Sequence, residues 1–226
     1  MVCRYKIAGK EVYKYCMPVI ESNMFILISD KKALVVDPNE NEDAVRLLKE
    51  KDVKDITILL THEHFDHVSG VNFFREKWPC VVYGNQRCKE MVPDPTMNMA
   101  AFFLAMFISR EEEERNKAQE LSREDYSCKV DIGFEEALDI QWEELSLHLL
   151  ETPGHSQGSI CIVVNNSAVF TGDSLVQGAK VITRLPGGSK KAYQTVTRPF
   201  LEGLPQDMLV FPGHGEEGFI KDFQIG

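Results

Sequence analysis

The chain has 226 residues, a length that fits one compact domain or two closely fused halves. Hydrophobic residues make up 43% and charged residues 27%, a composition that excludes a disordered or fibrous protein. The formal net charge is −10, whereas nucleic-acid binding usually requires a basic surface, so we expect no nucleic-acid partner.

Apolar runs in the chain are short. The N-terminal stretch MVCRYKIAGKEVYKYC has no continuous apolar run of the secretory type. The longest apolar run, MNMAAFFLAMFI at 97–108, is shorter than the roughly 20 residues needed to span a bilayer. The six cysteines are scattered without a C-x-x-C pair, which favours reduced thiols. We therefore expect a cytoplasmic protein without a membrane partner.

The first half of the chain alternates apolar runs of strand type with helical patterns. The turn signal Asp37-Pro38-Asn39 precedes the first helical pattern. The expected strands are 24–29, 33–37, 56–60 and 80–83, and the expected helices are 41–51 and 67–78.

A second series of strands begins near residue 129. Between the two series, residues 94–127 are helical in pattern, with an apolar part at 97–108 that precedes the charged run REEEER. We interpret 94–127 as a helical insertion between two β-rich halves of one domain that covers residues 1–226. The later elements are expected strands at 138–140, 145–151, 160–164, 167–171 and 208–211, and a helix from Ser189 to about Leu201.

Three of the six histidines gather in ILLTHEHFDHVSG at 58–70. This stretch follows a predicted strand and precedes a predicted helix, so its polar residues lie in a loop where functional groups can converge. His62 and His64 point to the same side of an extended chain, because side chains repeat every two residues. Imidazoles and a carboxylate at this spacing suit Zn²⁺ or Fe²⁺, which take nitrogen and oxygen ligands.

Three further loops place a histidine or an aspartate beside glycine after an apolar run. Glycine lets the backbone approach closely, as a loop around a metal requires. Each loop alone is typical of an ordinary turn, but all four in chain order indicate a metal site. The three loops are TPGHSQGSI with His155, VFTGDSLV with Asp173 and VFPGHGEE with His214.

This pattern resembles the metallo-β-lactamase superfamily over about residues 15–217, apart from the insertion. The resemblance implies an α/β fold with αββα layers, in which two mixed β-sheets lie between helices, and a site for two divalent metal ions. We expect zinc, with iron or manganese as alternatives. By the same resemblance, the first ion is held by His62, His64 and His155, the second by Asp66, His67 and His214, and Asp173 bridges the two.

A binuclear site of this kind needs no serine or cysteine nucleophile, because two ions about 3.5–4 Å apart can share a hydroxide. Asp66 is the expected catalytic side chain, which orients the hydroxide or carries a proton to the leaving group. Asp37 in VVDPN is similar to an early aspartate of the family that orients the ligands, and an Asx turn before Pro38 is the alternative interpretation.

The motifs look closest to the glyoxalase II-like metallohydrolases, which implies cleavage of a small ester or thioester. Asp173 in place of cysteine disfavours β-lactam hydrolysis, and His64 in place of glutamate separates the chain from flavodiiron proteins. The sequence has 12 residues after His214, where glyoxalase II continues into a glutathione-binding helical domain, so glutathione itself is not expected. The alternatives are a lactone or phosphodiester at the same site, an oxidoreductase similar to the mononuclear-iron persulfide dioxygenases, and a non-catalytic module.

The apolar segment 97–108 must be covered, because monomers rarely expose such a surface. It is an additional core helix, a lid over the metal cleft or a homodimer contact, and a lid predicts that Phe103 contacts the acyl part of a small-molecule substrate. Lys180 and Arg184 could meet an anionic substrate, with surface solvation as the alternative. His148 faces away from the apolar side of its strand and is expected at the surface.

Overall fold

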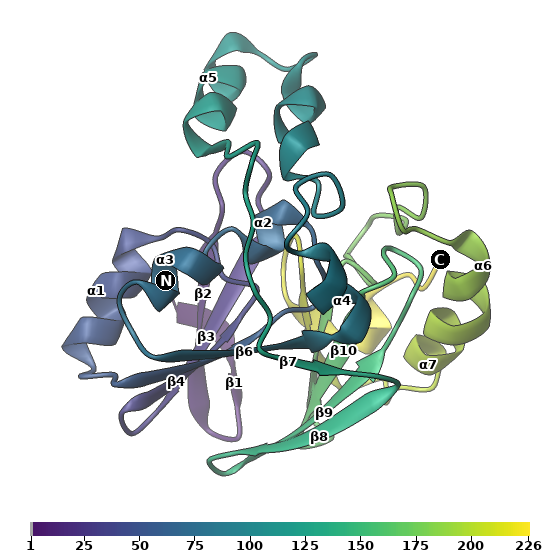
Figure 1. The fold of residues 1–226 in the computed structure, drawn as a ribbon. Helices are drawn as coiled ribbons and strands as arrows, with labels where there is room; N and C mark the ends of the chain where they lie inside the picture. Colours follow the sequence, from purple (N-terminus) through teal and green to yellow (C-terminus); the bar gives the residue numbers. More distant parts are fainter. Residues whose placement is uncertain (1) are drawn as a thin grey trace.

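The computed structural model describes residues 2–226, with side chains from Tyr5 onward, and contains two β-sheets packed face to face (Figure 1). Helices cover the outer face of each sheet (Figure 1). The αββα architecture is therefore confirmed. Five described cysteines are free thiols, and the side chain of Cys3 lies outside the described residues.

The first sheet has seven strands in chain order, and the second has six in the order β13-β12-β11-β10-β9-β8. The first sheet comprises β1 (Val2–Ile7), β2 (Lys10–Cys16), β3 (Asn23–Ser29), β4 (Lys32–Val36), β5 (Asp55–Leu59), β6 (Cys80–Asn85) and β7 (Ile132–Phe134). The second comprises β8 (Ala137–Trp142), β9 (Leu145–Glu151), β10 (Ile160–Val164), β11 (Ala168–Gly172), β12 (Leu209–Pro212) and β13 (Gly218–Phe219).

The helices fall into three groups along the chain. On the first sheet lie α1 (Glu42–Glu50), α2 (Phe65–Val68), α3 (Val71–Arg75) and α4 (Gln86–Met91). The segment 94–127 contains the 3-10 helix η1 (Ala100–Phe107) and α5 (Glu112–Leu121). On the second sheet, α6 (Lys190–Ala192) and α7 (Arg198–Glu202) flank a π-helical turn, η2 (Tyr193–Thr197), and the short 3-10 helix η3 (Ile220–Asp222) follows β13.

Three apolar cores separate the four layers. In β3, Ile26 packs toward the helices of the first sheet, whereas Phe25 and Leu27 pack between the two sheets. In β10, Ile162 faces the space between the sheets and Cys161 faces the helices on the other side. Burial on both faces explains why these strands are continuous apolar runs rather than alternating patterns.

Two expectations about the elements were wrong in detail. The helix predicted at 67–78 is two short helices, α2 and α3, separated at Ser69-Gly70. The chain passes so close to a neighbouring turn that a Cβ atom on Gly70 would lie 2.7 Å from the backbone of Pro38 and Asn39. The strands β1 and β2 were not predicted, because a mostly polar, partly buried strand such as KEVYKYC carries little apolar signal.

The segment 94–127 forms a helical hairpin that projects from the body of the molecule above α2 (Figure 1). Phe103 and Phe107 are buried in the core of the first sheet, and the Phe103 ring packs edge-on against Phe65 at 5.1 Å between centroids. Within residues 2–226 no helix combines the length and apolarity needed to cross a membrane.

Candidate metal centre

Four loops meet at one end of the two sheets to form the site. His62 and His64 follow β5, and Asp66 and His67 lie in the first turn of α2. The other three side chains come from the second half of the chain. His155 lies between β9 and β10, Asp173 directly follows β11, and His214 follows β12. The seven side chains expected from the motifs are thus brought together from both sheets.

The first group consists of His62, His64 and His155. All three are buried, and one ring nitrogen of each lies within 4.8 Å of the others. His155 Nε2 is 3.0 Å from His64 Nδ1. His62 Nε2 is buried without a hydrogen-bond partner in the described structure. Buried polar atoms normally have partners, so an unpartnered nitrogen in a histidine cluster fits a metal ligand.

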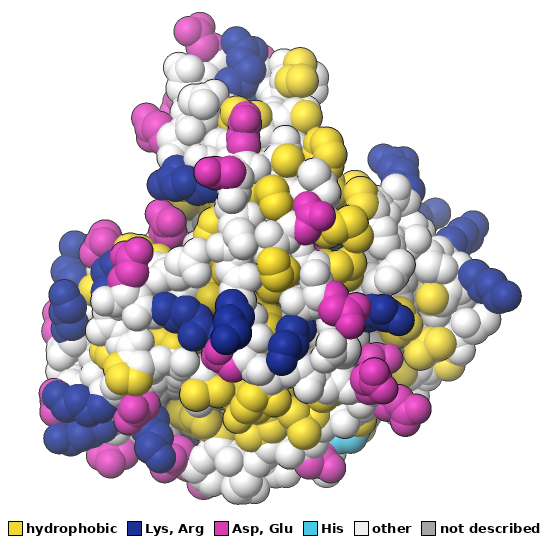
Figure 2. Space-filling view, in the orientation of Figure 1, with side chains coloured by type: hydrophobic (Ala, Val, Ile, Leu, Met, Phe, Trp, Pro, Cys, Tyr) yellow, Lys and Arg dark blue, Asp and Glu magenta, His cyan; other side chains and the backbone are white. Residues whose placement is uncertain are grey.

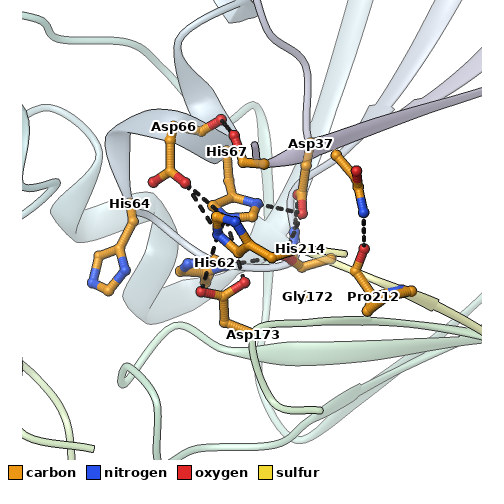
Figure 3. A network of polar contacts seen from close by, with 12 residues as sticks. Asp37, His62, His64, Asp66, His67, Gly172, Asp173, Pro212 and His214 are labelled. Atoms are coloured by element: carbon orange, nitrogen blue, oxygen red, sulfur yellow. Dashed lines mark hydrogen bonds and ion pairs between the residues drawn. The ribbon is translucent and has the colours of Figure 1, made fainter. Parts of the chain in front are cut away.

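The second group consists of Asp66, His67 and His214 (Figure 3). Asp66 Oδ2 is 3.2 Å from His67 Nε2 and 3.4 Å from His214 Nε2. The two histidine nitrogens are themselves 3.4 Å apart. One carboxylate oxygen and two imidazole nitrogens therefore point at one place, and such a set suits a divalent cation.

Asp173 contacts both groups, and Figure 3 shows its carboxylate beneath the rings of the second group, pointing toward His67 and His214. Its Oδ2 is 3.4 Å from His155 Nε2 in the first group and 3.5 Å from His214 Nε2 in the second. Gly213 makes this position accessible, because a Cβ atom there would lie 2.3 Å from Asp173 Oδ1. One carboxylate therefore contacts both groups, as a bridging ligand would.

The ring nitrogens that face away from the centre are held by hydrogen-bond partners. His155 Nδ1 lies 2.9 Å from the carbonyl oxygen of Ile182, and His214 Nδ1 lies 3.0 Å from that of Ile20. A hydrogen bond at one ring nitrogen fixes the tautomer and directs the other nitrogen to the centre.

Asp37 holds the ring nitrogen of His67 that faces away from the centre. Its Oδ2 is 3.0 Å from His67 Nδ1, and the carboxylate also accepts hydrogen bonds from the amide and hydroxyl groups of Thr61. Asp37, His62 and His67 are close enough to form a third metal-binding group. Because both Asp37 oxygens already have partners on the far side of His67, we assign Asp37 to orienting that ring.

The pKa values of the histidines shift in opposite directions in the two groups. Burial, together with the neighbouring His67 and His64, holds the pKa of His62 well below its ordinary value. Burial and His155 lower the pKa of His64 to about 3. Burial also lowers the pKa of His155, so all three rings of the first group favour the neutral form, which is the ligand form of imidazole.

In the second group, nearby carboxylates outweigh burial. Burial lowers the pKa of His67, but Asp66 and Asp173 together raise it well above its ordinary value. The pKa of His214 is raised in the same way, against burial, by Asp173 and Asp66. Burial raises the pKa of Asp66, yet His67 and His214 hold it well below its ordinary value. The two carboxylates are therefore ionised and would attract a cation, which would replace the protons that the same carboxylates hold on the two imidazole rings.

Two supporting residues were missed by the sequence analysis. Thr61 holds Asp37, and its Oγ1 also lies 3.1 Å from His62 Nδ1. Glu63 is fully buried and accepts a hydrogen bond of 2.9 Å from Ser156 Oγ, which links the His62 loop to the His155 loop. Burial raises the pKa of Glu63 to about 7. Their only sequence signal is their position beside the histidines.

A cavity of about 320 Å³ opens over the metal centre. Lys180 lines this cavity and Arg184 does not, so only Lys180 is placed to meet a substrate. His148 lies at the surface beside Asp139, 2.7 Å away, as expected. The cavity is lined by Ile20, His64, Asp66, Met99, Met106, His155, Asp173, Val176, Ala179, Lys180, Val181, Ile182, Leu185 and His214.

Comparison with known proteins gives the same superfamily as the sequence motifs, over most of the chain. The family model of the metallo-beta-lactamase superfamily matches residues 17–214. A probable metallo-hydrolase of Bacillus subtilis, YqgX, is 34% identical over 205 residues, which are 89% of each chain. A hydroxyacylglutathione hydrolase of an Enterobacter species is 27% identical over 202 residues, covering 88% of this chain and 64% of that protein.

Solved structures agree in fold. BLEG-1, a B3 metallo-beta-lactamase, superposes with a TM-score of 0.74 at 25% identity and covers 93% of this chain and 95% of its own. TTHA1623, solved in a di-iron-bound form, gives a TM-score of 0.71 at 25% identity and covers 93% of this chain and 96% of its own. This superfamily binds divalent metals through histidine and aspartate clusters of the kind found here. With its fold, its clustered side chains and its matched residues, the chain belongs to the metallo-beta-lactamase superfamily.

Proposed function

We propose that the protein is a binuclear metallohydrolase that cleaves a small ester or thioester. In this proposal the group His62, His64 and His155 would hold the first ion, and the group Asp66, His67 and His214 would hold the second. Asp173 would contact both ions. The observation that carries the proposal is the position of the Asp173 carboxylate, 3.4 Å from His155 Nε2 and 3.5 Å from His214 Nε2. A carboxylate within reach of both ligand groups would be able to contact both ions.

The bound ions would lower the pKa of water toward ~7 and polarise the scissile carbonyl group. Asp66 lines the cavity and is positioned to accept the proton of the attacking water and transfer it to the leaving thiolate or alkoxide. No serine, threonine or cysteine lines the described cavity, so the chain offers no alternative nucleophile there. The apolar side chains around the centre would exclude bulk water once a substrate fills the cavity, which would strengthen these polar contacts.

We propose zinc as the resident metal because nitrogen-rich ligand sets suit it, with iron or manganese as alternatives. The similarity to TTHA1623, which was solved with two irons, supports iron as the first of these alternatives. For the substrate, similarity to a hydroxyacylglutathione hydrolase supports a thioester. A lactone and a phosphodiester are the alternative substrates for the same site. Similarity to BLEG-1 adds a β-lactam to these alternatives, although Asp173 in place of cysteine disfavours it.

Metal content and hydrolysis of acetyl thioesters, measured on the same purified samples, test the proposal. We expect about two metal equivalents in the wild type. Asp173→Ala should lower the content of both ions, whereas His214→Ala should deplete mainly one. Hydrolysis should require both ions, and turnover of nitrocefin in place of the thioester would favour the β-lactam candidate.

Several outcomes would count against the binuclear hydrolase. Equal metal loss in Asp173→Ala and His214→Ala across a metal titration would contradict the bridge. One iron equivalent together with thiol-dependent oxygen uptake would favour an oxidoreductase similar to the persulfide dioxygenases. Absence of bound metal after metal loading would favour a non-catalytic module.

A further inference from the structure

The cavity over the metal centre is almost entirely apolar above its polar floor. Its lining side chains other than the metal-centre residues are apolar with the single exception of Lys180. These apolar side chains come from three separate segments of the chain: Ile20, the projecting hairpin and the loop 176–185. At about 320 Å³, the cavity lies at the small end of the range for ligand sites, roughly 300–1,000 Å³.

The helical hairpin contributes Met99 and Met106 to one wall of the cavity. Met99 has a left-handed backbone, with φ of 70°, which a residue with a side chain adopts at an energetic cost. Phe103, one turn of η1 before Met106, points instead into the core and does not line the cavity. The expectation that Phe103 contacts a substrate was therefore wrong, and the hairpin is both a core element and a cavity wall.

The base of the hairpin is fastened to the metal centre. The carbonyl oxygen of Asn98 accepts a 2.7 Å hydrogen bond from the amide of Phe65, which lies between His64 and Asp66 in sequence. The buried amide group of Asn98 donates to the carbonyl oxygens of Val92 and Tyr126, at 3.0 and 2.9 Å, and so joins the two ends of the hairpin. Met99 is the next residue, so its position relative to the metal ligands is fixed.

The opposite wall is fixed in the same way. Val181, Ile182 and Leu185 line it, and the carbonyl oxygen of Ile182 lies 2.9 Å from His155 Nδ1.

Hydrophobic side chains run along the edge of the projecting hairpin and down toward the body of the molecule (Figure 2). Of the two methionines that line the cavity, Met106 is 42% exposed and Met99 is half-buried, so we place Met106 at the outer end of the cavity.

We propose, on the basis of the proposed hydrolase function, that this site selects substrates with an extended apolar acyl chain and that Met106 determines the chain length. The acyl carbonyl lies at the metal centre and the hydrocarbon tail lies between the hairpin and loop 176–185. In the reaction, the oxygen of water bonds to the acyl carbon, the carbon–sulfur or carbon–oxygen bond breaks, and the proton from water passes to the leaving group. Methionine suits this wall because its flexible side chain adapts to irregular apolar partners.

The test compares acetyl, butanoyl, hexanoyl and octanoyl thioesters of one small thiol. In the wild type, kcat/KM should rise from acetyl to hexanoyl, because each methylene in the cavity adds apolar contact. Met106→Asp should lower kcat/KM for the octanoyl thioester roughly tenfold relative to the acetyl thioester. Phe102→Asp is the matched control, because Phe102 is on the same helix and 45% exposed but does not line the cavity. In this variant the ratio of kcat/KM for the octanoyl thioester to that for the acetyl thioester should equal the wild-type ratio.

Some results would overturn the acyl-chain proposal alone. If the acetyl thioester is hydrolysed and chain length or Met106→Asp does not change the relative rates, the hydrolase stands and the acyl wall is wrong. Equal effects of Phe102→Asp and Met106→Asp would also overturn it. A uniform loss of activity with a shift from dimer to monomer in sedimentation would assign the hairpin to a homodimer contact instead.

A failed hydrolase would still leave the acyl wall testable. If no acyl thioester is cleaved by protein with full metal content, calorimetric titration with acetate and octanoate decides the inference. Tighter binding of octanoate that is reduced by Met106→Asp and kept in Phe102→Asp would support the wall. Equal binding of the two acids would overturn it.

Discussion

The metal-ligand loops and the helical hairpin 94–127 line the same cavity but are built in opposite ways. The loops present nitrogen and oxygen atoms that are mostly buried, closely spaced and held by partners such as Asp37 and Thr61. The hairpin presents methionine side chains, and its outer surface carries exposed apolar residues such as Phe102 and Ile108.

This difference follows from what each region must do. Metal binding needs a few polar atoms in fixed positions, so each ligand requires a particular residue type and a supporting hydrogen bond. An apolar wall needs only area and approximate shape, which many side chains supply. In the proposed function, reaction chemistry therefore belongs to the loops that carry the metal ligands, and substrate selection to the apolar wall formed by the hairpin and the loop 176–185.

The largest expected effect is the loss of activity when a metal ligand in the loops is substituted. His62→Ala and His155→Ala should each lower kcat for an activated thioester by at least about 100-fold, because each removes an expected metal ligand. Circular dichroism should show an intact fold, since both residues lie in loops outside the core strands. His148→Ala, at an exposed histidine, is the control and should retain full activity. Retention of kcat and metal content in either loop variant would refute the ligand assignment.

A smaller effect is expected where the two regions are joined. Asn98→Ala removes the buried amide that joins Val92 and Tyr126 and should lower the free energy of unfolding by about 2 kcal/mol. That loss corresponds to a fall in Tm of about 5 °C. Asn72→Ala removes one exposed hydrogen bond, to the carbonyl oxygen of Ser127, and should change Tm little. Similar melting curves for the two variants would show that the hairpin does not depend on Asn98.

The smallest effect concerns the segment that returns from the hairpin to β7. Partial burial raises the pKa of Asp131, but the amide of Val82 and the guanidinium of Arg75 lower it below its ordinary value overall. A lowered pKa in the folded state stabilises the fold above the unfolded-state pKa of about 3.9, and this contribution is lost as pH falls through the folded-state value.

Asp131→Asn should therefore lower the free energy of unfolding by about 1 kcal/mol at pH 7, a value discounted because the ion pair with Arg75 is partly exposed. Thermal melts from pH 7 to pH 3 should show the difference between variant and wild type shrinking below about pH 4. A difference that stays constant over this range would mean that Asp131 acts through packing and not through its charge.

Much of the fold was predictable because burial on both faces leaves continuous apolar runs. The strands β3, β4, β5, β10 and β11 were predicted to within a residue or two of their bounds. The hairpin β1–β2 was not, since its outward-facing side chains are mostly polar and its pairing with β3 is a tertiary contact. The break between α2 and α3 was also missed, because Gly70 is required by the nearby backbone of Pro38 and Asn39, which are distant in sequence.

The sequence by itself determined the family and the set of side chains at the metal centre. Each of those side chains stands next to a glycine or in a short repeat after an apolar strand, and such local patterns survive without knowledge of the fold. Asp37 remained ambiguous in the sequence between an Asx turn and a residue that orients a ligand. Only its 3.0 Å contact with His67, which is 30 positions away, decided this.

Only the tertiary structure shows where the side chains of the apolar segment 97–108 lie. Its composition is compatible with a core helix, a lid or a dimer contact, because apolar burial has no directional requirement. The fold divides the segment instead: Phe103 and Phe107 enter the core, while Met99 and Met106 line the cavity over the metal centre. Which side chains enter the core depends on which side of η1 faces the metal-ligand loops. The hydrogen bond from the amide of Phe65 to the carbonyl oxygen of Asn98 helps to set this orientation, and no local sequence pattern encodes that contact.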